Sequence, residues 1–170
     1  IGEVLDALEA IGEAENTIIV LTGDHGYFLG ERGLFYKMSF HEFSARVPMI
    51  VSAPGRFKAG RVSANVSLVD LMPTFLEWGG NGTMPELHAA INGHGLNNLL
   101  EGDARGWPDT AYGEYAAEGS LWPLLMVRKG RYKYIYGEED PPLLFDLEAD
   151  PHEIINLAGD PDHAQAEAHL

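Results

Sequence analysis

The chain has 170 residues, of which 45% are hydrophobic and 22% are charged, and it contains no cysteine. This length and composition are typical of a globular domain with a sizeable core, and the lack of cysteine excludes disulfides and thiolate metal sites within the chain. The net charge of −15 and the lack of any apolar run of about 18 residues argue against nucleic acid and membranes as partners.

The chain starts without an initiator methionine or a basic leader, which we interpret as a start within a longer protein. Residues 1–11 place apolar side chains on one face of a helix, which Gly12 would end. Thr17–Thr22 is a β-branched apolar run, typical of a strand covered on both faces in a parallel sheet. Val47–Ser52 is the next strand candidate. The long loop between them, Gly23–Arg46, is the expected functional segment, because ligands bind beyond the carboxyl ends of strands in open α/β sheets.

Ser67 is a predicted helix N-cap, and Asp70 stands where it completes a capping box. The helix would cover residues 68–76 and end at Gly79-Gly80. Residues 81–109 are rich in glycine, asparagine and proline, and we interpret them as a linker over the surface.

The composition changes near residue 110, where short segments predict an antiparallel sheet. Lys129-Gly130-Arg131 is a strong signal for a hairpin turn. Asp150 and Pro151 open a short helix or turn, and the small polar residues after Ala158 predict a frayed tail. We expect strands at residues 110–115, 124–128, 132–136 and 143–147.

Together the elements predict an α/β fold in which a sheet-and-helix part is followed by a small antiparallel subdomain. We expect the C-terminal portion of the α/β core at 1–80, the linker at 81–109, the antiparallel subdomain at 110–158 and the tail at 159–170.

Asp24 and His25 directly follow the first predicted strand, between Gly23 and Gly26. A carboxylate oxygen and an imidazole at a rigid strand end suit a divalent cation, and the glycines let the backbone turn sharply. In the alternative interpretation, Asp24 caps a turn and His25 packs beside it.

Lys37 lies further along the same loop, where its compact positive charge would suit an anionic group. A solvated surface lysine is the alternative. Glu42 and Arg46 are spaced i,i+4, which by itself predicts a helical ion pair worth about 0.3–0.5 kcal/mol.

Several segments occur in one order at close spacing, and their combination is more specific than any one of them. Together they resemble the C-terminal part of the type I sulfatase family, in the alkaline-phosphatase-like superfamily. The resemblance covers residues 1 to about 158 and rests on Thr22-Gly23-Asp24-His25-Gly26, Leu29-Gly30-Glu31-Arg32-Gly33, Lys37, Arg46-Val47-Pro48-Met49-Ile50-Val51, Asp70-Leu71-Met72-Pro73-Thr74 and Leu144-Phe145-Asp146-Leu147-Glu148-Ala149-Asp150-Pro151-His152-Glu153.

The resemblance implies roles for individual residues. Asp24 and His25 match metal ligands of the family, usually for calcium and sometimes for manganese or magnesium. Lys37 matches the catalytic lysine that contacts the sulfate and neutralises charge as the ester bond breaks. The family's nucleophile, a formylglycine made from cysteine or serine, lies upstream with the first metal ligands, outside this chain. The isolated chain is therefore expected to lack activity, because charge stabilisation requires the complete site.

Residues 30–40, 113–119 and 126–134 are similar to choline sulfatases. Glu114 matches the position expected to face the choline ammonium, which aromatic faces and a carboxylate can hold. A surface acid at a strand end is the alternative. We expect Tyr115 to pack in the core and His94 to lie on the surface. Choline sulfatases are cytoplasmic oligomers, so this resemblance favours that compartment and a homo-oligomer.

The expected substrate is thus a small-molecule sulfate ester, with choline sulfate favoured. A phosphonate monoester or phosphodiester hydrolase of the same superfamily is the enzymatic alternative, because such relatives share the Asp-His-Gly turn. A non-catalytic fragment or assembly module is the alternative of another class, because a sheet face left bare would be apolar and prone to association.

Overall fold

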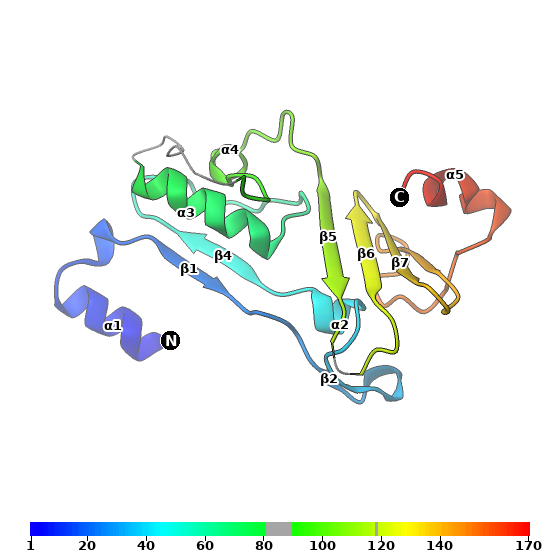
Figure 1. Ribbon diagram of the computed structural model, residues 1–170. Helices are drawn as coiled ribbons and strands as arrows, with labels where there is room; N and C mark the ends of the chain where they lie inside the picture. The colour runs from blue at the N-terminus through cyan, green and yellow to red at the C-terminus, as the bar shows by residue number, and fades with distance from the viewer. Residues whose placement is uncertain (81–89, 118) are drawn as a thin grey trace.

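The fold was analysed in a computed structural model, which describes residues 1–80, 90–117 and 119–170. A two-stranded ribbon with neighbouring helices forms the N-terminal part, and a four-stranded sheet forms the C-terminal part (Figure 1). The helices are α1 (Gly2–Ala10), α2 (Glu42–Ala45), α3 (Leu71–Gly79), α4 (Asn97–Leu100) and α5 (Ala164–Glu167). The strands are β1 (Ile19–Thr22), β2 (Phe28–Leu29), β3 (Phe35–Tyr36), β4 (Met49–Ser52), β5 (Thr110–Tyr115), β6 (Leu124–Lys129), β7 (Tyr132–Gly137) and β8 (Leu143–Asp146). The mixed α/β class and the C-terminal antiparallel sheet are confirmed.

The ribbon of β1 and β4 differs from the prediction. Both strands lie where the sequence placed them, but they pair antiparallel, with Ile19 opposite Ser52 and Thr22 opposite Met49. The parallel sheet that the Thr17–Thr22 run suggested is therefore not formed by this pair of strands. An apolar run reports burial and not strand direction, so the sequence pattern could not distinguish the two arrangements.

Apolar side chains in the N-terminal part remain exposed. The predicted first helix is confirmed as α1, which ends before Gly12 at φ 77°. Ile1, Val4 and Ile11 on this helix and its ends are exposed, and so is Ile50 of β4. No helix within the described ranges is both long and apolar enough to cross a membrane.

The four-stranded sheet contains the main core. Its order is β5-β6-β7-β8, with every neighbouring pair antiparallel. The predicted hairpin is confirmed, since Lys129 pairs with Tyr132 across Gly130, whose φ is 53°. The core on one face of this sheet contains Ile135, Phe145 and Leu147, with Phe40, Met126 and Leu143 packed against it. Because Phe40 belongs to the Gly23–Arg46 loop, that loop is anchored on the C-terminal sheet.

The segment expected to be a surface linker is partly a packed element. Residues 81–89 lie outside the described residues, but within 90–109 both Leu96 and Leu99 are buried. Thr74 of α3 accepts a hydrogen bond from the Leu96 N–H (2.9 Å). Asp70, whose predicted capping box with Ser67 is confirmed, also accepts one from the His94 N–H (2.9 Å). Polar side chains of α3 and of the turn before it thus hold a segment whose composition suggested only a linker.

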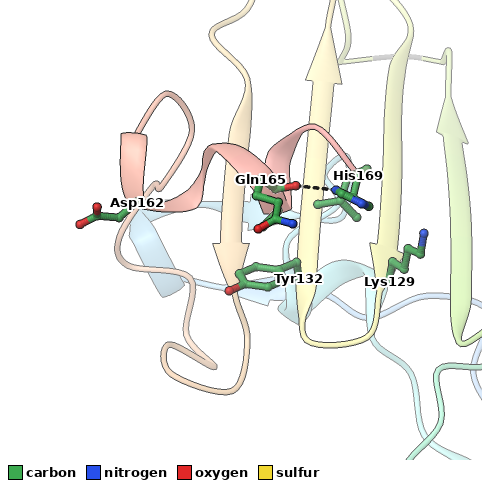
Figure 2. A pocket seen from close by; sticks show the side chains of 7 residues that line it. Lys129, Tyr132, Asp162, Gln165 and His169 are labelled. Atoms are coloured by element: carbon green, nitrogen blue, oxygen red, sulfur yellow. Dashed lines mark hydrogen bonds between the residues drawn. The ribbon is translucent and has the colours of Figure 1, made fainter.

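The expected frayed tail is also ordered. Residues 161–163 form a helical turn that continues into α5, and Asp160 caps it by accepting a hydrogen bond from the Asp162 N–H (3.0 Å). The helix lies over the hairpin of β6 and β7, where Lys129, Tyr132 and Gln165 line a shallow pocket (Figure 2). The Asp160-Pro161 start signal therefore prevails over the small polar composition.

Candidate active site

The turn after β1 carries Asp24 and His25 and is pressed against α2. A Cβ atom placed on Gly26 would lie 2.1 Å from the Phe43 carbonyl oxygen, so a side chain cannot fit there. The Gly26 N–H donates a hydrogen bond to the Ser44 carbonyl oxygen of α2 (2.7 Å). The glycine expected to allow a sharp turn thus also allows a close approach between two backbones.

Lys37 reaches the same turn from the hairpin of β2 and β3. Tyr36, just before it, has φ 76°, a left-handed conformation that costs roughly 1–2 kcal/mol for a residue with a side chain. The Lys37 Nζ lies 2.6 Å from His25 Nε2. The Lys37 carbonyl oxygen accepts a hydrogen bond from the buried Ser44 hydroxyl. Ser44 therefore binds both the turn that carries Asp24 and His25 and the segment that carries Lys37.

The hydrogen bonds of His25 orient its ring. Its Nδ1 lies 2.8 Å from the Gly26 carbonyl oxygen, which can only accept, so Nδ1 carries the proton. Its Nε2 therefore presents a lone pair to Lys37 and lies 3.3 Å from Asp24 Oδ2. The hydrogen bond from the His25 N–H to Asp24 is the leading cause that lowers the pKa of this carboxyl.

Asp24 and His25 suit a cation but make an incomplete set of ligands. Their lone-pair atoms face each other at 3.3 Å, an arrangement that a shared cation would relieve, and the Asp24 side chain is 86% exposed. Among the described residues, however, no group of three or more His, Cys, Asp or Glu side chains is placed to hold a metal. A cation at this turn would need further ligands from elsewhere.

Glu114 is not in direct contact with these three residues. It is exposed near the end of β5, and its side chain forms no hydrogen bond or ion pair within the described part of the chain. Its neighbour Gly113 faces the core side, because a Cβ there would lie 2.5 Å from the Phe40 ring. The loop after β5 does reach the lysine segment, since a Cβ on Gly119 would lie 3.2 Å from Met38 Cγ. The structure therefore brings three of the four predicted site residues together and places the fourth on β5, in the C-terminal sheet.

Comparison with protein families identifies the family of the chain. The family model for N-sulphoglucosamine sulphohydrolase, C-terminal, matches residues 30–170. The chain belongs to the sulfatase family. The match includes Lys37 and Glu114 and corresponds to the C-terminal region of these enzymes.

Individual relatives agree with this assignment. A choline-sulfatase of Rhizobium meliloti (strain 1021) is 41% identical over 161 residues, which is 95% of this chain and 31% of the relative. A solved structure in complex with its substrate D-glucosamine-2-N,6-O-disulfate has a TM-score of 0.83 and 34% identity, covering 99% of this chain and 35% of the other. The phosphonate monoester hydrolase of Agrobacterium radiobacter has a TM-score of 0.83 and 30% identity, covering 99% and 36%. The sulfatase chain thus has the alkaline-phosphatase-like fold of its neighbours and spans about a third of their length.

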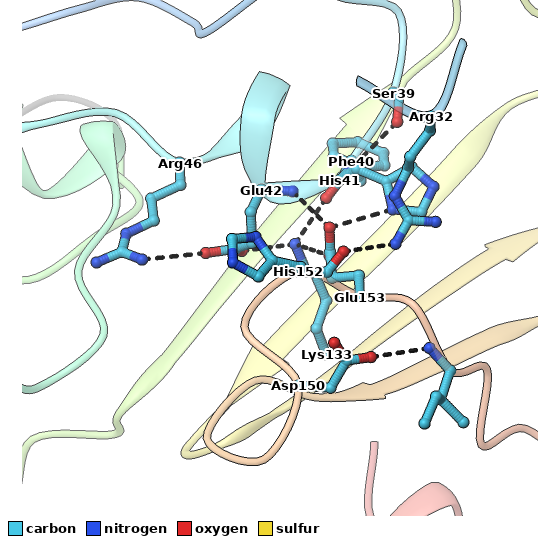
Figure 3. A network of polar contacts seen from close by, with 11 residues as sticks. Arg32, Ser39, Phe40, His41, Glu42, Arg46, Lys133, Asp150, His152 and Glu153 are labelled. Carbon is cyan, nitrogen blue, oxygen red and sulfur yellow. Dashed lines mark hydrogen bonds and ion pairs between the residues drawn. The ribbon is translucent and has the colours of Figure 1, made fainter. Parts of the chain in front are cut away.

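A buried polar network behind the site was missed by the sequence reasoning (Figure 3). At its centre is Lys133 of β7, whose side chain is 1% exposed. Its Nζ lies 2.6 Å from Glu42 Oε1, 2.7 Å from Glu153 Oε1 and 2.8 Å from the Phe40 carbonyl oxygen. Glu42 also forms the expected pair with Arg46, but at 3.7 Å. The shorter pair with Lys133 joins residues 91 positions apart, which i,i+4 spacing cannot indicate.

Glu153 is fully buried in this sulfatase chain, yet it stays ionised. Burial alone would raise its pKa. His41 and Lys133, together with the Glu42 N–H, stabilise the carboxylate and lower its pKa to about 2. Glu153 ends the Asp150-Pro151-His152-Glu153 segment, which supported the resemblance to sulfatases. The segment did not show that Lys133 is the partner of Glu153.

Acid should weaken the fold through Glu153. Its pKa falls from 4.5 in the unfolded chain to about 2 in the folded one. The resulting stabilisation, about 3 kcal/mol, is present above pH 4.5 and is lost as the pH falls toward 2. Urea unfolding midpoints measured from pH 7 to 2 should therefore drop less steeply below pH 5 in Glu153→Gln than in the wild type. Glu148→Gln, at a carboxylate that is 69% exposed, should keep the wild-type profile, and identical profiles in all three proteins would contradict this role.

Proposed function

We propose that this chain is the C-terminal part of a longer sulfuric ester hydrolase, called here the parent protein, which hydrolyses sulfate monoesters. The observation that carries the proposal is the convergence of Asp24, His25 and Lys37, with Lys37 Nζ 2.6 Å and Asp24 Oδ2 3.3 Å from the same imidazole nitrogen. Membership of the sulfatase family supports it. The nucleophile, proposed to be a formylglycine, and the remaining metal ligands would come from the upstream part of the parent protein.

Each of these three residues has a distinct role in this proposal. Asp24 and His25 would hold a divalent cation, calcium in the first place and manganese or magnesium as alternatives, which when bound supplies Lewis-acid polarisation of a sulfate oxygen. The Gly26 carbonyl keeps the proton on His25 Nδ1 and so keeps Nε2 available. That nitrogen has one lone pair, which Lys37 now contacts. A cation there would direct the Lys37 ammonium toward the anionic sulfate, where it stabilises charge on the departing oxygen.

Loss of metal affinity would test the proposed role of Asp24. In the parent protein, Asp24→Ala should weaken calcium binding at least about 100-fold, because it removes a charged ligand and not a supporting residue. Isothermal titration calorimetry measures the affinity directly. Asp6→Ala, at an exposed carboxylate of α1, is the matched control and should bind calcium as the wild type does. Unchanged affinity in Asp24→Ala would remove it from the site.

We favour choline sulfate as the substrate because of the surroundings of Glu114. Tyr112 lies two residues earlier on the same face of β5 and is 70% exposed. A free carboxylate beside an exposed aromatic ring suits a quaternary ammonium. The similarity to a choline-sulfatase supports this choice.

A substitution that removes the charge of Glu114 would test this substrate. Glu114→Gln in the parent protein should raise the Michaelis constant for choline sulfate about tenfold, because the ammonium loses its counter-charge. The constant for an aryl sulfate that carries no cationic group should stay unchanged. Glu101→Gln, also at an exposed position, should alter neither constant. An unaltered constant for choline sulfate would exclude Glu114 from substrate recognition.

A phosphonate monoester hydrolase is the second candidate, favoured by the 0.83 TM-score to such an enzyme. Steady-state kinetics of the parent protein on choline sulfate, an aryl sulfate and a phosphonate monoester would separate the two. Sulfate-ester rates no higher than the phosphonate rate would overturn the sulfatase proposal.

A non-catalytic assembly role is the candidate of another class, favoured by the exposed apolar residues Ile1, Val4, Ile11 and Ile50. Light scattering on the isolated chain would test it. A monomer with a cooperative melt would argue against assembly.

A further inference from the structure

Helix α2 is capped by a residue from the far end of the chain. The N-cap residue His41 makes no side-chain capping hydrogen bond of its own. The Glu42 N–H donates instead to Glu153 Oε2 (2.8 Å), and His41 Nδ1 lies 3.2 Å from the same oxygen. A helical turn of four residues is unstable alone, so α2 depends on this distant carboxylate.

Glu153 is itself held in a fixed position. Lys133 lies 2.7 Å from its other oxygen and is bound at the same time by Glu42 and by the Phe40 carbonyl (Figure 3). The Glu153 backbone has φ 56°, a conformation that a residue with a side chain keeps only where its surroundings determine it. Next to it, the His152 carbonyl accepts a hydrogen bond from Arg32 (2.6 Å), which joins this turn to the loop once more.

The same short helix bears the contacts that assemble the site. Its Ser44 accepts the hydrogen bond from the Gly26 N–H (2.7 Å) and donates one to the Lys37 carbonyl. A displacement of α2 would therefore move Lys37 and the Asp24-His25 turn relative to each other. The path runs from Lys133 through Glu153 to α2 and then to Lys37, with a hydrogen bond or ion pair at every step.

We infer that Glu153 and Lys133 are positioning residues, which set the place of Lys37 against the Asp24-His25 turn by capping α2 from the C-terminal sheet. The structural half of this inference stands on the contacts alone. The kinetic half rests on the proposed function, because it assumes that Lys37 acts on the substrate.

Hydrogen exchange tests the structural half without reference to activity. In the parent protein, Glu153→Gln should speed exchange of the Gly26 amide and of amides 42–46 at least about tenfold, while β6 and β7 keep wild-type rates. Glu148→Gln is the matched control, with the same chemical change at an exposed position of the neighbouring turn, and it should leave all these rates unchanged. Unchanged exchange at Gly26 and in α2, or an equal increase everywhere, would overturn the inference.

Ser44→Ala gives a second test that leaves the buried charges intact. It removes only the hydroxyl that binds the Lys37 carbonyl, and faster exchange should then be confined to the lysine segment, residues 37–40. Ser63→Ala, at an exposed serine, is the control. Wild-type exchange throughout in Ser44→Ala would break the last step of the path, from α2 to Lys37, and would overturn the inference even if Glu153→Gln fails to fold.

A double-mutant cycle on sulfate-ester turnover tests the kinetic half. In an otherwise wild-type background, Glu153→Gln should lower kcat/KM about 10- to 100-fold, as the loss of a residue that supports a ligand does at metal sites. In the Lys37→Ala background the same change should cost no more than about threefold, because the lysine it positions is gone. Equal losses in both backgrounds would show a merely structural residue and overturn this half. A Lys37→Ala variant of wild-type activity would instead overturn the proposed function and leave the exchange result standing.

Discussion

Lys37→Ala in the parent protein should lower kcat for sulfate esters by roughly 10²–10³, the loss expected when one preorganised charge is removed from the transition state. The structure supports this role, because Lys37 Nζ lies 2.6 Å from His25 Nε2 and no other lysine or arginine of the described residues is hydrogen-bonded to this imidazole. Steady-state kinetics with choline sulfate and an aryl sulfate measure it, and both substrates should lose the same factor.

Two further variants make this result specific. Lys58→Ala, at an exposed lysine outside the loop, should retain wild-type kcat. Lys37→Arg keeps the positive charge but replaces a compact ammonium with a planar fork, so it should recover only part of the loss. A kcat for Lys37→Ala within about threefold of wild type would exclude the lysine from catalysis.

Lys133→Met should reduce the free energy of unfolding by about 3–5 kcal/mol, because it leaves the carboxylates of Glu42 and Glu153 without their buried partner. The methionine keeps most of the apolar volume of the lysine stem, so the loss reports charge and not a cavity. Urea unfolding followed by circular dichroism measures the change. Lys129→Met, four residues earlier on the exposed end of the same hairpin, should change the free energy by less than about 0.5 kcal/mol.

Removing the Glu153 charge as well shows whether the loss in Lys133→Met comes from an unpaired buried charge or from a cavity. Lys133→Met/Glu153→Leu no longer buries the Glu153 charge and should recover part of the stability lost in the single variant. It should not recover the position of α2, because the leucine cannot accept the Glu42 N–H. A double variant less stable than the sum of the two single variants would contradict this account.

Much of the local structure followed from the sequence. The Lys129-Gly130-Arg131 turn predicted the hairpin of β6 and β7, and Ser67 with Asp70 predicted the start of the helical segment that becomes α3. The prediction of a surface linker was wrong for the segment around Leu96, because it rested on composition alone. The segment around Leu96 is packed because Thr74 and Asp70 have spare oxygens for its N–H groups, and composition does not show such partners.

The sequence selected residues that lie together in the structure, but not the residues that hold them there. Motif context selected Asp24, His25 and Lys37, and the structure places all three together. Neither Ser44 nor Lys133 was selected. Ser44 acts through its backbone carbonyl, which any residue provides, and through a hydroxyl whose partner the sequence does not show. Lys133 resembles any strand lysine until its burial is known. Contacts between residues separated by 91 positions or more leave no periodic trace in a single sequence.

The distant cap on α2 also fixes when the site can form during synthesis. Glu42 leaves the ribosome 111 residues before Glu153, a delay of roughly 6–22 s at 5–20 residues per second. Throughout that interval the lysine loop exists without the carboxylate that orders its helix. A protein truncated just before residue 153 would keep Asp24, His25, Lys37 and Glu114 and still lack an assembled site. The helix that bears the contacts of Lys37 and of the Asp24-His25 turn is therefore completed by a residue made long after it.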